Sequence, residues 1–288
     1  MNRSAALLRV WLPLAAAAAL GCATASGTGA DGPTAAAAPA PPARPPARAG
    51  RSATGETATQ EAQHRARMNY QLGVEQLRKG NSPEAIAALL EARRWDPQSE
   101  RTELALSEAY REQGRDRDAE AHLLRALQIK PGFQQGLLNL AALYIQTDRY
   151  EEALAPLHRL LDDATFPGPW RALTNLGWAE YRLGRVDDAF QHLTLAVDQR
   201  PDYWPARLDL GILEAERGNH AEAIAQFQHV LDKQPGPSAE AEARYRLAEQ
   251  LLAQGDRQGA RRQLTTASRL EPSGPWSNRS AEMLKTLD

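Results

Sequence analysis

One pattern of small and large residues recurs along most of the chain at intervals close to 34 residues. In each copy a small residue is followed by Ala after 12 positions and by Leu or Phe after a further four, as at Gly177, Ala189 and Leu193. This repeat constrains the fold more than any other feature of the sequence, because a unit so short cannot bury both of its faces and must stack on its neighbours.

The copy from Leu173 to Pro201 shows what one unit contains. Apolar or small residues recur at helical spacing in two runs, Leu176, Gly177 and Tyr181 in the first and Ala189, Leu193 and Ala196 in the second. Gly184 lies between the runs and predicts the end of the first helix, and Pro201 predicts the end of the second because it has no N–H to continue it. Each unit is therefore predicted to be a helical hairpin.

Six copies occur in register, and the third lacks the closing proline. Their shared positions are Gly73, Ala85, Leu89, Ala92 and Pro97; Ser107, Ala119, Leu123, Ala126 and Pro131; Ala141, Ala153 and Leu157; Gly177, Ala189, Leu193, Ala196 and Pro201; Gly211, Ala223, Phe227 and Pro235; and Ala248, Ala260, Leu264, Ala267 and Pro272. This pattern resembles the tetratricopeptide repeat. The resemblance implies an all-α fold, a right-handed solenoid of six helical hairpins over residues 63–272.

The register gains two residues between the third and fourth copies, within 162–170, and three between the fifth and sixth, at 236–238. Insertions in a stacked array are accommodated in loops, so both are expected to protrude at one edge. Residues 273–288 predict a C-terminal capping helix that runs from Trp276 to Leu287. Its packed side is expected to carry Ala281, Leu284 and Leu287, and its exposed side Ser277, Asn278, Glu282 and Lys285.

The N-terminal residues indicate export. Arg3 and Arg9 precede an apolar run, 10–20, that is too short to cross a bilayer as a stable helix. The sequence Ala-Leu-Gly-Cys that ends at Cys22 resembles a bacterial lipobox, which implies a lipoprotein signal peptide over residues 1–22 and a covalent lipid on Cys22. Cys22 is the single cysteine, which favours this interpretation over an ordinary cleavage site followed by an incidental cysteine. Ala23 after the cysteine implies sorting to the outer membrane.

Residues 23–62 are rich in Ala and Pro and nearly free of large apolar side chains. Such a segment cannot bury enough surface to offset the entropy lost on ordering. We expect a disordered tether here, either to give reach from a membrane or as filler without a length requirement.

No sequence motif for catalysis is present, so the protein is not expected to be an enzyme or to hold a metal. The six histidines, His64, His122, His158, His192, His220 and His229, are expected to be solvated residues on helix surfaces. The net charge of -2 and the lack of a basic run give no reason to expect nucleic-acid binding. The only cofactor-like group expected is the lipid on Cys22.

What remains is a surface for protein binding. The first helices of stacked hairpins line a concave face, and the central copies predict an apolar groove bordered by amides there: Leu138, Asn139, Ala142, Ile145, Asn175, Trp178, Tyr181, Leu208 and Ile212. Asn139 and Asn175 occupy the same repeat position, which in peptide-binding members of the superfamily pairs with the main chain of a partner. The alternative is that Trp178 and Tyr181 pack between repeats and the Asn side chains bond neighbouring helices.

The fourth copy carries a second resemblance. The segment Thr-Phe-Pro-Gly-Pro-Trp at 165–170, followed by Leu-Thr-Asn-Leu-Gly-Trp-Ala at 173–179, is similar to the insertion and following helix of type IV pilus biogenesis lipoproteins, the pilotins. This implies a lipid-anchored protein on the periplasmic face of the outer membrane that binds a pilus secretin subunit and promotes secretin assembly. The alternative is a general periplasmic scaffold, for example a cofactor of a cell-wall synthase.

Overall fold

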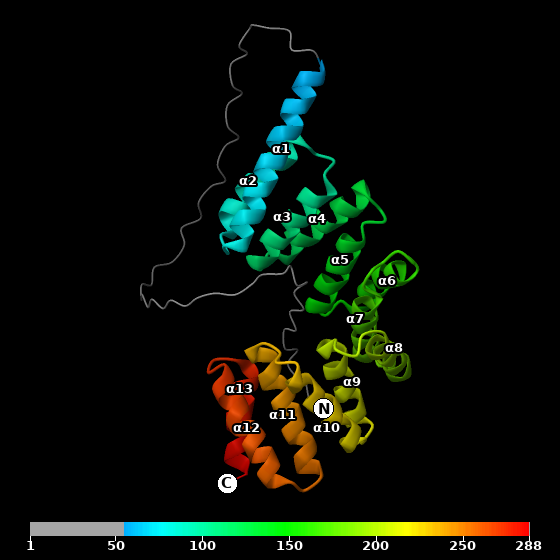
Figure 1. Ribbon diagram of the computed structural model, residues 1–288, viewed down its shortest axis with the longest axis vertical. Helices are drawn as coiled ribbons and strands as arrows, with labels where there is room; N and C mark the ends of the chain where they lie inside the picture. The colour runs from blue at the N-terminus through cyan, green and yellow to red at the C-terminus, as the bar shows by residue number, and fades with distance from the viewer. Residues whose placement is uncertain (1–54, 288) are drawn as a thin grey trace, which may run out of the picture.

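The computed structural model describes residues 55–287, and this part of the chain is a stack of helices without a strand (Figure 1). The helices are α1 (Gly55–Arg78), α2 (Ser82–Trp95), α3 (Glu100–Glu112), α4 (Asp116–Ile129), α5 (Gln134–Gln146), α6 (Tyr150–Leu161), α7 (Pro169–Arg182), α8 (Val186–Gln199), α9 (Trp204–Glu216), α10 (His220–Asp232), α11 (Pro237–Ala253), α12 (Arg257–Leu270) and α13 (Pro275–Thr286). The predicted all-α solenoid of six hairpins and a C-terminal helix is confirmed.

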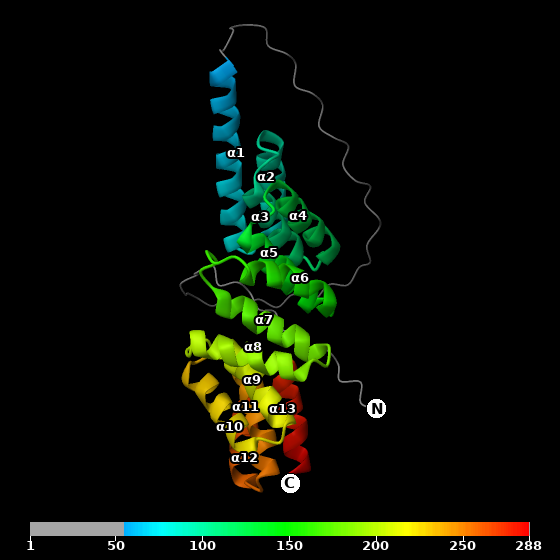
Figure 2. The same cartoon turned by 90° about the vertical axis from the view of Figure 1, so that its right-hand side faces the viewer.

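Packing runs along the stack. Each odd-numbered helix pairs with the next even-numbered one as a hairpin, and each hairpin rests on the following one, as α6 does on α7. In Figures 1 and 2, α1 therefore lies at one end of the molecule and α12 and α13 lie at the other. The main contacts join helices no more than two apart along the chain.

Small residues lie where the two helices of a hairpin cross. A Cβ atom added to Gly177 would lie 2.7 Å from Cγ of Leu193 and 3.1 Å from the carbonyl oxygen of Ala189, and both of these neighbours are fully buried. Since real Cβ atoms do not approach other atoms this closely, the crossing of α7 and α8 requires a residue without a side chain. The repeated small position in the sequence has this physical cause.

The turn inside each hairpin contains one residue with a positive φ angle. Five of these residues are glycines, for example Gly184 at φ +80°, and the third hairpin has Asp148 at φ +59° instead. Residues with a Cβ rarely adopt this conformation, although Asp tolerates it better than most. The first helix of each hairpin therefore ends at a turn glycine, or at Asp148 in the third hairpin.

Two expectations about element boundaries are wrong. Helix α1 begins at Gly55, so residues 55–62 belong to a helix and not to the expected tether. The second insertion forms no protruding loop, because its residues lengthen α11, which has 17 residues and starts at Pro237. The first insertion does form the expected loop, between Leu161 and Pro169. The expected signal peptide, Cys22 and the tether up to residue 54 lie outside the described residues.

The capping helix α13 is confirmed, but its packed side was only partly predicted. Ser277 is buried, where exposure was expected, and its hydroxyl donates to the carbonyl oxygen of Ala267 at 2.7 Å. The hydroxyl oxygen of Ser277 in turn accepts from the backbone N–H of Glu271 at 3.3 Å, so Ser277 satisfies polar groups at the end of α12. Leu284 and Leu287 pack against the last hairpin as expected.

None of the helices between residues 55 and 287 combines the length and apolar character that crossing a bilayer requires.

Candidate functional site

The central first helices α5, α7 and α9 carry the residues predicted to line a groove, and the structure divides them into two groups. Leu138, Ile145, Leu208 and Ile212 are buried in the core. The expectation that these four side chains line an open channel is therefore wrong, because neighbouring repeats cover them. Asn139, Ala142, Asn175, Trp178 and Tyr181 remain partly exposed.

The two asparagines differ although they share a repeat position. The Oδ1 atom of Asn139 accepts from Nε2 of Gln135 at 3.0 Å, and Asn139 also hydrogen-bonds the carboxyl group of Glu108 on the neighbouring first helix. Burial raises the pKa of Glu108, and the nearby Arg111 and the bond from Asn139 only partly oppose this effect. Across the described residues, the side chain of Asn175 has no hydrogen bond, so its amide is available to a partner.

Trp178 and Tyr181 connect repeats. Their ring centroids lie 5.2 Å apart at an interplanar angle of 44°. Trp178 packs against both the N-terminal core and the cluster around Leu208 and Ile212, and the Tyr181 hydroxyl donates to Glu216 on α9. Burial, followed by this hydrogen bond, raises the pKa of Tyr181. Both side chains thus have a structural role between repeats, as the alternative interpretation held.

The first insertion forms a pocket beside this surface that the sequence did not indicate. The pocket has a volume of ≈ 540 Å³ and lies among the end of α4, the start of α5, the loop and the start of α7. It is lined by Lys130, Gly132, Phe133, Gln134, Gln135, Asp163, Thr165, Phe166, Pro167, Gly168, Trp170 and Arg171. Three aromatic rings, two amides and two cations therefore surround one cavity.

Polar contacts hold the loop against α5. Nε2 of Gln134 donates to Oδ2 of Asp163 at 2.6 Å and to Oγ1 of Thr165 at 3.1 Å. The backbone N–H of Thr165 donates to Oδ1 of Asp163 at 2.9 Å, which closes a turn. The hydrogen bonds from Thr165 and then from Gln134 lower the pKa of Asp163. The loop is thus fixed to the neighbouring repeat, and Phe166 packs against the core.

The pocket and the groove residues are continuous along two helices. Gln135 lines the pocket and donates to Asn139 one turn further along α5. Arg171 lines the pocket and precedes Asn175 by one turn on α7. We define the central docking surface as this pocket together with Asn139, Asn175 and the exposed parts of Trp178 and Tyr181. It offers aromatic rings for apolar side chains and amides for a main chain. The inserted loop was the one sequence signal that could have located the pocket.

Three of the histidines that were expected to be solvated are hydrogen-bonded to other side chains instead. Nδ1 of His122 lies 2.6 Å from Oε2 of Glu103, and Nδ1 of His192 lies 2.6 Å from Oε2 of Glu180. His220 contacts Oε1 of Gln250 at 2.8 Å. Among residues 55–287, no three His, Cys, Asp or Glu side chains are grouped so that they could hold a metal ion.

A stack of helical hairpins with an amide and aromatic surface on its first helices defines a scaffold for binding other proteins. Two family models described as tetratricopeptide repeat match the chain, one at 70–132 and 138–203 and the other at 180–241 and 214–277, which together span most of it. The chain therefore belongs to the tetratricopeptide-repeat family.

Several solved structures share the fold. PilW, described as a widely conserved type IV pilus biogenesis factor, superposes with a TM-score of 0.66 at 21% identity over 75% of this chain and 98% of PilW. PilF of Pseudomonas aeruginosa superposes with a TM-score of 0.66 at 19% identity, over 78% of this chain and 99% of PilF. A tetratricopeptide repeat protein from Parabacteroides merdae superposes with a TM-score of 0.61 at 20% identity, over 81% of this chain and 90% of that protein. No curated protein matches the chain in sequence.

Proposed function

We propose that the protein is a pilotin, a non-enzymatic outer-membrane lipoprotein that binds subunits of a type IV pilus secretin and promotes their assembly into a stable ring. Two observations support this function beyond a general scaffold role. PilW and PilF, the first a type IV pilus biogenesis factor, share the fold over almost their entire lengths. The fourth repeat carries the inserted Thr-Phe-Pro-Gly-Pro-Trp segment at 165–170, which resembles the corresponding segment of that family.

The observation that carries the binding mode is the docking surface itself. An extended secretin segment pairs its main chain with the free amide of Asn175 and places an apolar side chain among Phe133, Phe166 and Trp170. Arg171, at the junction of pocket and helix, has a guanidinium that suits a carbonyl or carboxylate of the same segment. Trp178 contributes by keeping the two neighbouring repeats in register more than by direct contact.

Membrane attachment is a separate part of the proposal. A diacyl lipid on Cys22 would hold the protein at the periplasmic face of the outer membrane, with the segment up to the start of α1 as its connection. Replacement of Cys22 by Ser should abolish labelling by radioactive palmitate and release the protein from washed envelopes. Labelling that persists in the Cys22→Ser variant would contradict this assignment.

Secretin binding is tested by co-purification from detergent-solubilised envelopes. The double variant Asn175→Ala with Arg171→Gln alters the docking surface without touching a buried side chain. We expect it to retain at least tenfold less secretin than the wild type, and to lower the amount of heat-resistant secretin multimers in cells. The matched control is Gln191→Ala, which removes an exposed amide from α8, the second helix of the same hairpin.

The alternative partner gives a different result. If the tagged wild type enriches a cell-wall synthase while secretin multimers remain intact in a strain without the protein, the chain is a periplasmic scaffold and not a pilotin. Equal secretin recovery with both variants would keep the pilotin role but exclude this docking surface.

A further inference from the structure

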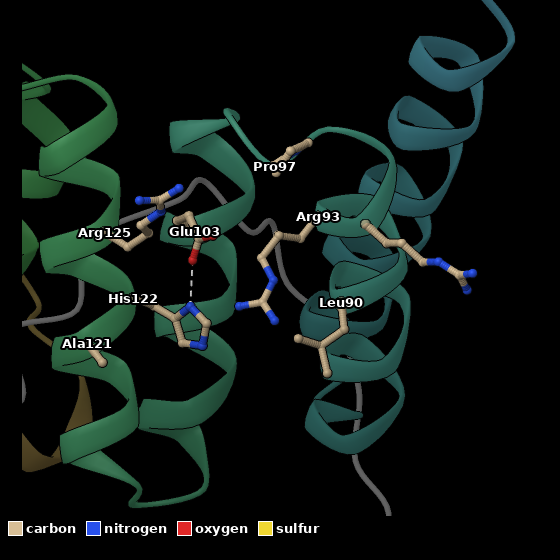
Figure 3. A pocket seen from close by; sticks show the side chains of 8 residues that line it. Leu90, Arg93, Pro97, Glu103, Ala121, His122 and Arg125 are labelled. Atoms are coloured by element: carbon tan, nitrogen blue, oxygen red, sulfur yellow. Dashed lines mark hydrogen bonds and ion pairs between the residues drawn. The ribbon is translucent and has the colours of Figure 1, made fainter. Parts of the chain in front are cut away.

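A second pocket opens between two neighbouring second helices. Its walls are formed by α2 and α4, and the start of α3 contributes Glu103 between these two helices (Figure 3). Its volume is ≈ 560 Å³, within the range of ligand sites in proteins. The apolar part of its wall comes from Leu90, Pro97 and Ala121, and the polar part from Arg93, Arg94, Glu103, His122 and Arg125.

The floor of this pocket is a fixed pair of titratable side chains. Glu103 is 2% exposed and His122 is 14% exposed, with 2.6 Å between Oε2 and Nδ1. Because a carboxylate can only accept, Nδ1–H of His122 donates to Glu103. The imidazole also stacks on Tyr110, with ring centroids 5.1 Å apart and planes within 6°. Stacking and hydrogen bond together fix the orientation of the ring.

Two arginines at the pocket lack an acidic partner. Within residues 55–287, Arg93 makes no hydrogen bond or ion pair, and Arg125 makes only a 3.5 Å contact with Gln128. Figure 3 shows the guanidinium of Arg93 in the space between α2 and α4, on the side where His122 lies. Arg94 differs, since it pairs with Glu91 at 3.8 Å. The formal charges of Arg93, Arg125 and Glu103 are +1, +1 and -1, so these three side chains together carry a net charge of +1.

The fourth repeat offers a comparison for the histidine position. His192 occupies the repeat position of His122 and is also paired with a glutamate at 2.6 Å, but its partner Glu180 lies near the end of α7, whereas Glu103 lies near the start of α3. The positions equivalent to Arg93 and Arg125 are there Leu161 and Leu195. Of the two regions, only the pocket between α2 and α4 therefore carries the additional arginines.

We propose that this pocket binds the carboxylate of an acidic side chain in an extended protein segment. Arg93 and Arg125 carry two positive charges against the one negative charge of Glu103, so one further carboxylate would be neutralised here. A phosphate dianion would be repelled by Glu103 and would leave an excess of negative charge. Leu90, Pro97 and Ala121 contact the aliphatic part of the segment. The pocket is separate from the central docking surface, so it gives the scaffold a second contact for the same partner or another one.

The test uses the full chain and a short acetylated, amidated peptide of Ala and Leu with one central Glu. The NMR signal of Cε1–H of His122, assigned by its loss in His122→Gln, is followed as peptide is added. We expect a saturable shift of this signal and none for His192. The same peptide with Gln in place of Glu should cause at least a tenfold smaller effect at equal concentration.

Variants of the two arginines test whether they cause the peptide-induced shift of the His122 signal. Arg93→Gln and Arg125→Gln should each weaken binding about tenfold. Arg117→Gln, an exposed change on the same helix α4 outside the pocket, should leave the affinity unchanged. Glu103→Gln keeps the shape of the floor while removing its negative charge, so it should tighten binding, which a purely structural Glu103 would not do.

The outcomes separate the possible ligands. No shift of His122, equal effects of the Glu and Gln peptides, or wild-type affinity in both arginine variants would overturn the proposal. Tighter binding of inorganic phosphate or of free propionate than of the peptide would also overturn it, in favour of a small-anion site.

Discussion

Arg149 forms a bidentate ion pair with Glu120 of the preceding hairpin, with Nη1 at 2.6 Å from Oε2 and Nη2 at 3.0 Å from Oε1. The same guanidinium contacts Glu152 at the start of α6 with Nη2 at 2.6 Å. The hydrogen bonds to Glu152 and then to Glu120 raise the pKa of Arg149. One side chain therefore connects the second hairpin to the third at their turns.

This pair should contribute measurably to stability, unlike most surface ion pairs. A double-mutant cycle with Arg149→Ala and Glu120→Gln should give a coupling free energy of about 1 kcal/mol at low salt, the upper end of the range for exposed pairs, because the geometry is bidentate. Urea unfolding at 20 mM and 500 mM NaCl measures it, and the coupling should fall at the higher salt concentration. The control is the exposed pair Arg115 and Asp118 within one hairpin, for which we expect little coupling. A coupling near zero at both salt concentrations would contradict this assignment.

The helix crossing at Gly177 should not tolerate a methyl group. Gly177→Ala places a Cβ atom 2.7 Å from Leu193, so we expect it to lower the free energy of unfolding by about 1–3 kcal/mol despite the better helix propensity of Ala. Gly132→Ala is the matched control, because no atom lies within 4 Å of the added Cβ. Thermal unfolding of the two variants compares them, and equal midpoints would show that the crossing is looser than described.

Glu108 should make stability depend on pH. Its pKa is raised in the folded protein, so the folded state holds this proton more tightly than the unfolded chain does. The resulting stabilisation is present below the ordinary glutamate pKa, about 4.3, and is lost as pH rises through the raised folded-state value. Glu108→Gln should therefore unfold at higher urea than the wild type at pH 7, and the difference should shrink at pH 4. A difference that is constant over this interval would be inconsistent with a raised pKa.

Trp178 and Asn175 should separate structural from binding roles. Trp178→Ala removes a ring that packs against two core clusters, so we expect a loss of about 2–3 kcal/mol, less than for a fully buried Trp. Asn175→Ala removes an amide without a hydrogen-bond partner and should change stability by less than about 0.5 kcal/mol. Urea unfolding measures both. A large loss for Asn175→Ala would reveal an internal role and disqualify it as a clean binding variant.

The sequence predicted those parts of the fold that depend on local pattern. The small residue at each crossing, as at Gly177, and the turn glycine, as at Gly184, are imposed by the geometry of one hairpin. The small residue recurs in every copy, and the turn glycine in all but the third, where Asp148 replaces it. The number of hairpins and the final helix followed from them. The lengthened start of α11 did not, because whether inserted residues form a loop or extend a helix depends on local capping, here by Pro237.

The candidate site was predicted less well, because it depends on side chains from adjacent repeats. Leu138 and Ile212 have the same helical spacing as groove residues, and only the volume of the neighbouring side chains decides that they are covered. The contact between His122 and Glu103 joins residues on two helices with no shared motif. The inserted loop was visible in the sequence, but the pocket that it forms with Phe133 required the packed structure.

The restriction of helix contacts to near neighbours in the chain has a consequence for how the protein folds. Few distant segments have to meet before stabilising contacts form, which gives the chain a low contact order and favours rapid folding. Folding can begin at any pair of adjacent hairpins and spread in both directions. During synthesis, such a chain can start to fold as soon as its first two hairpins have emerged.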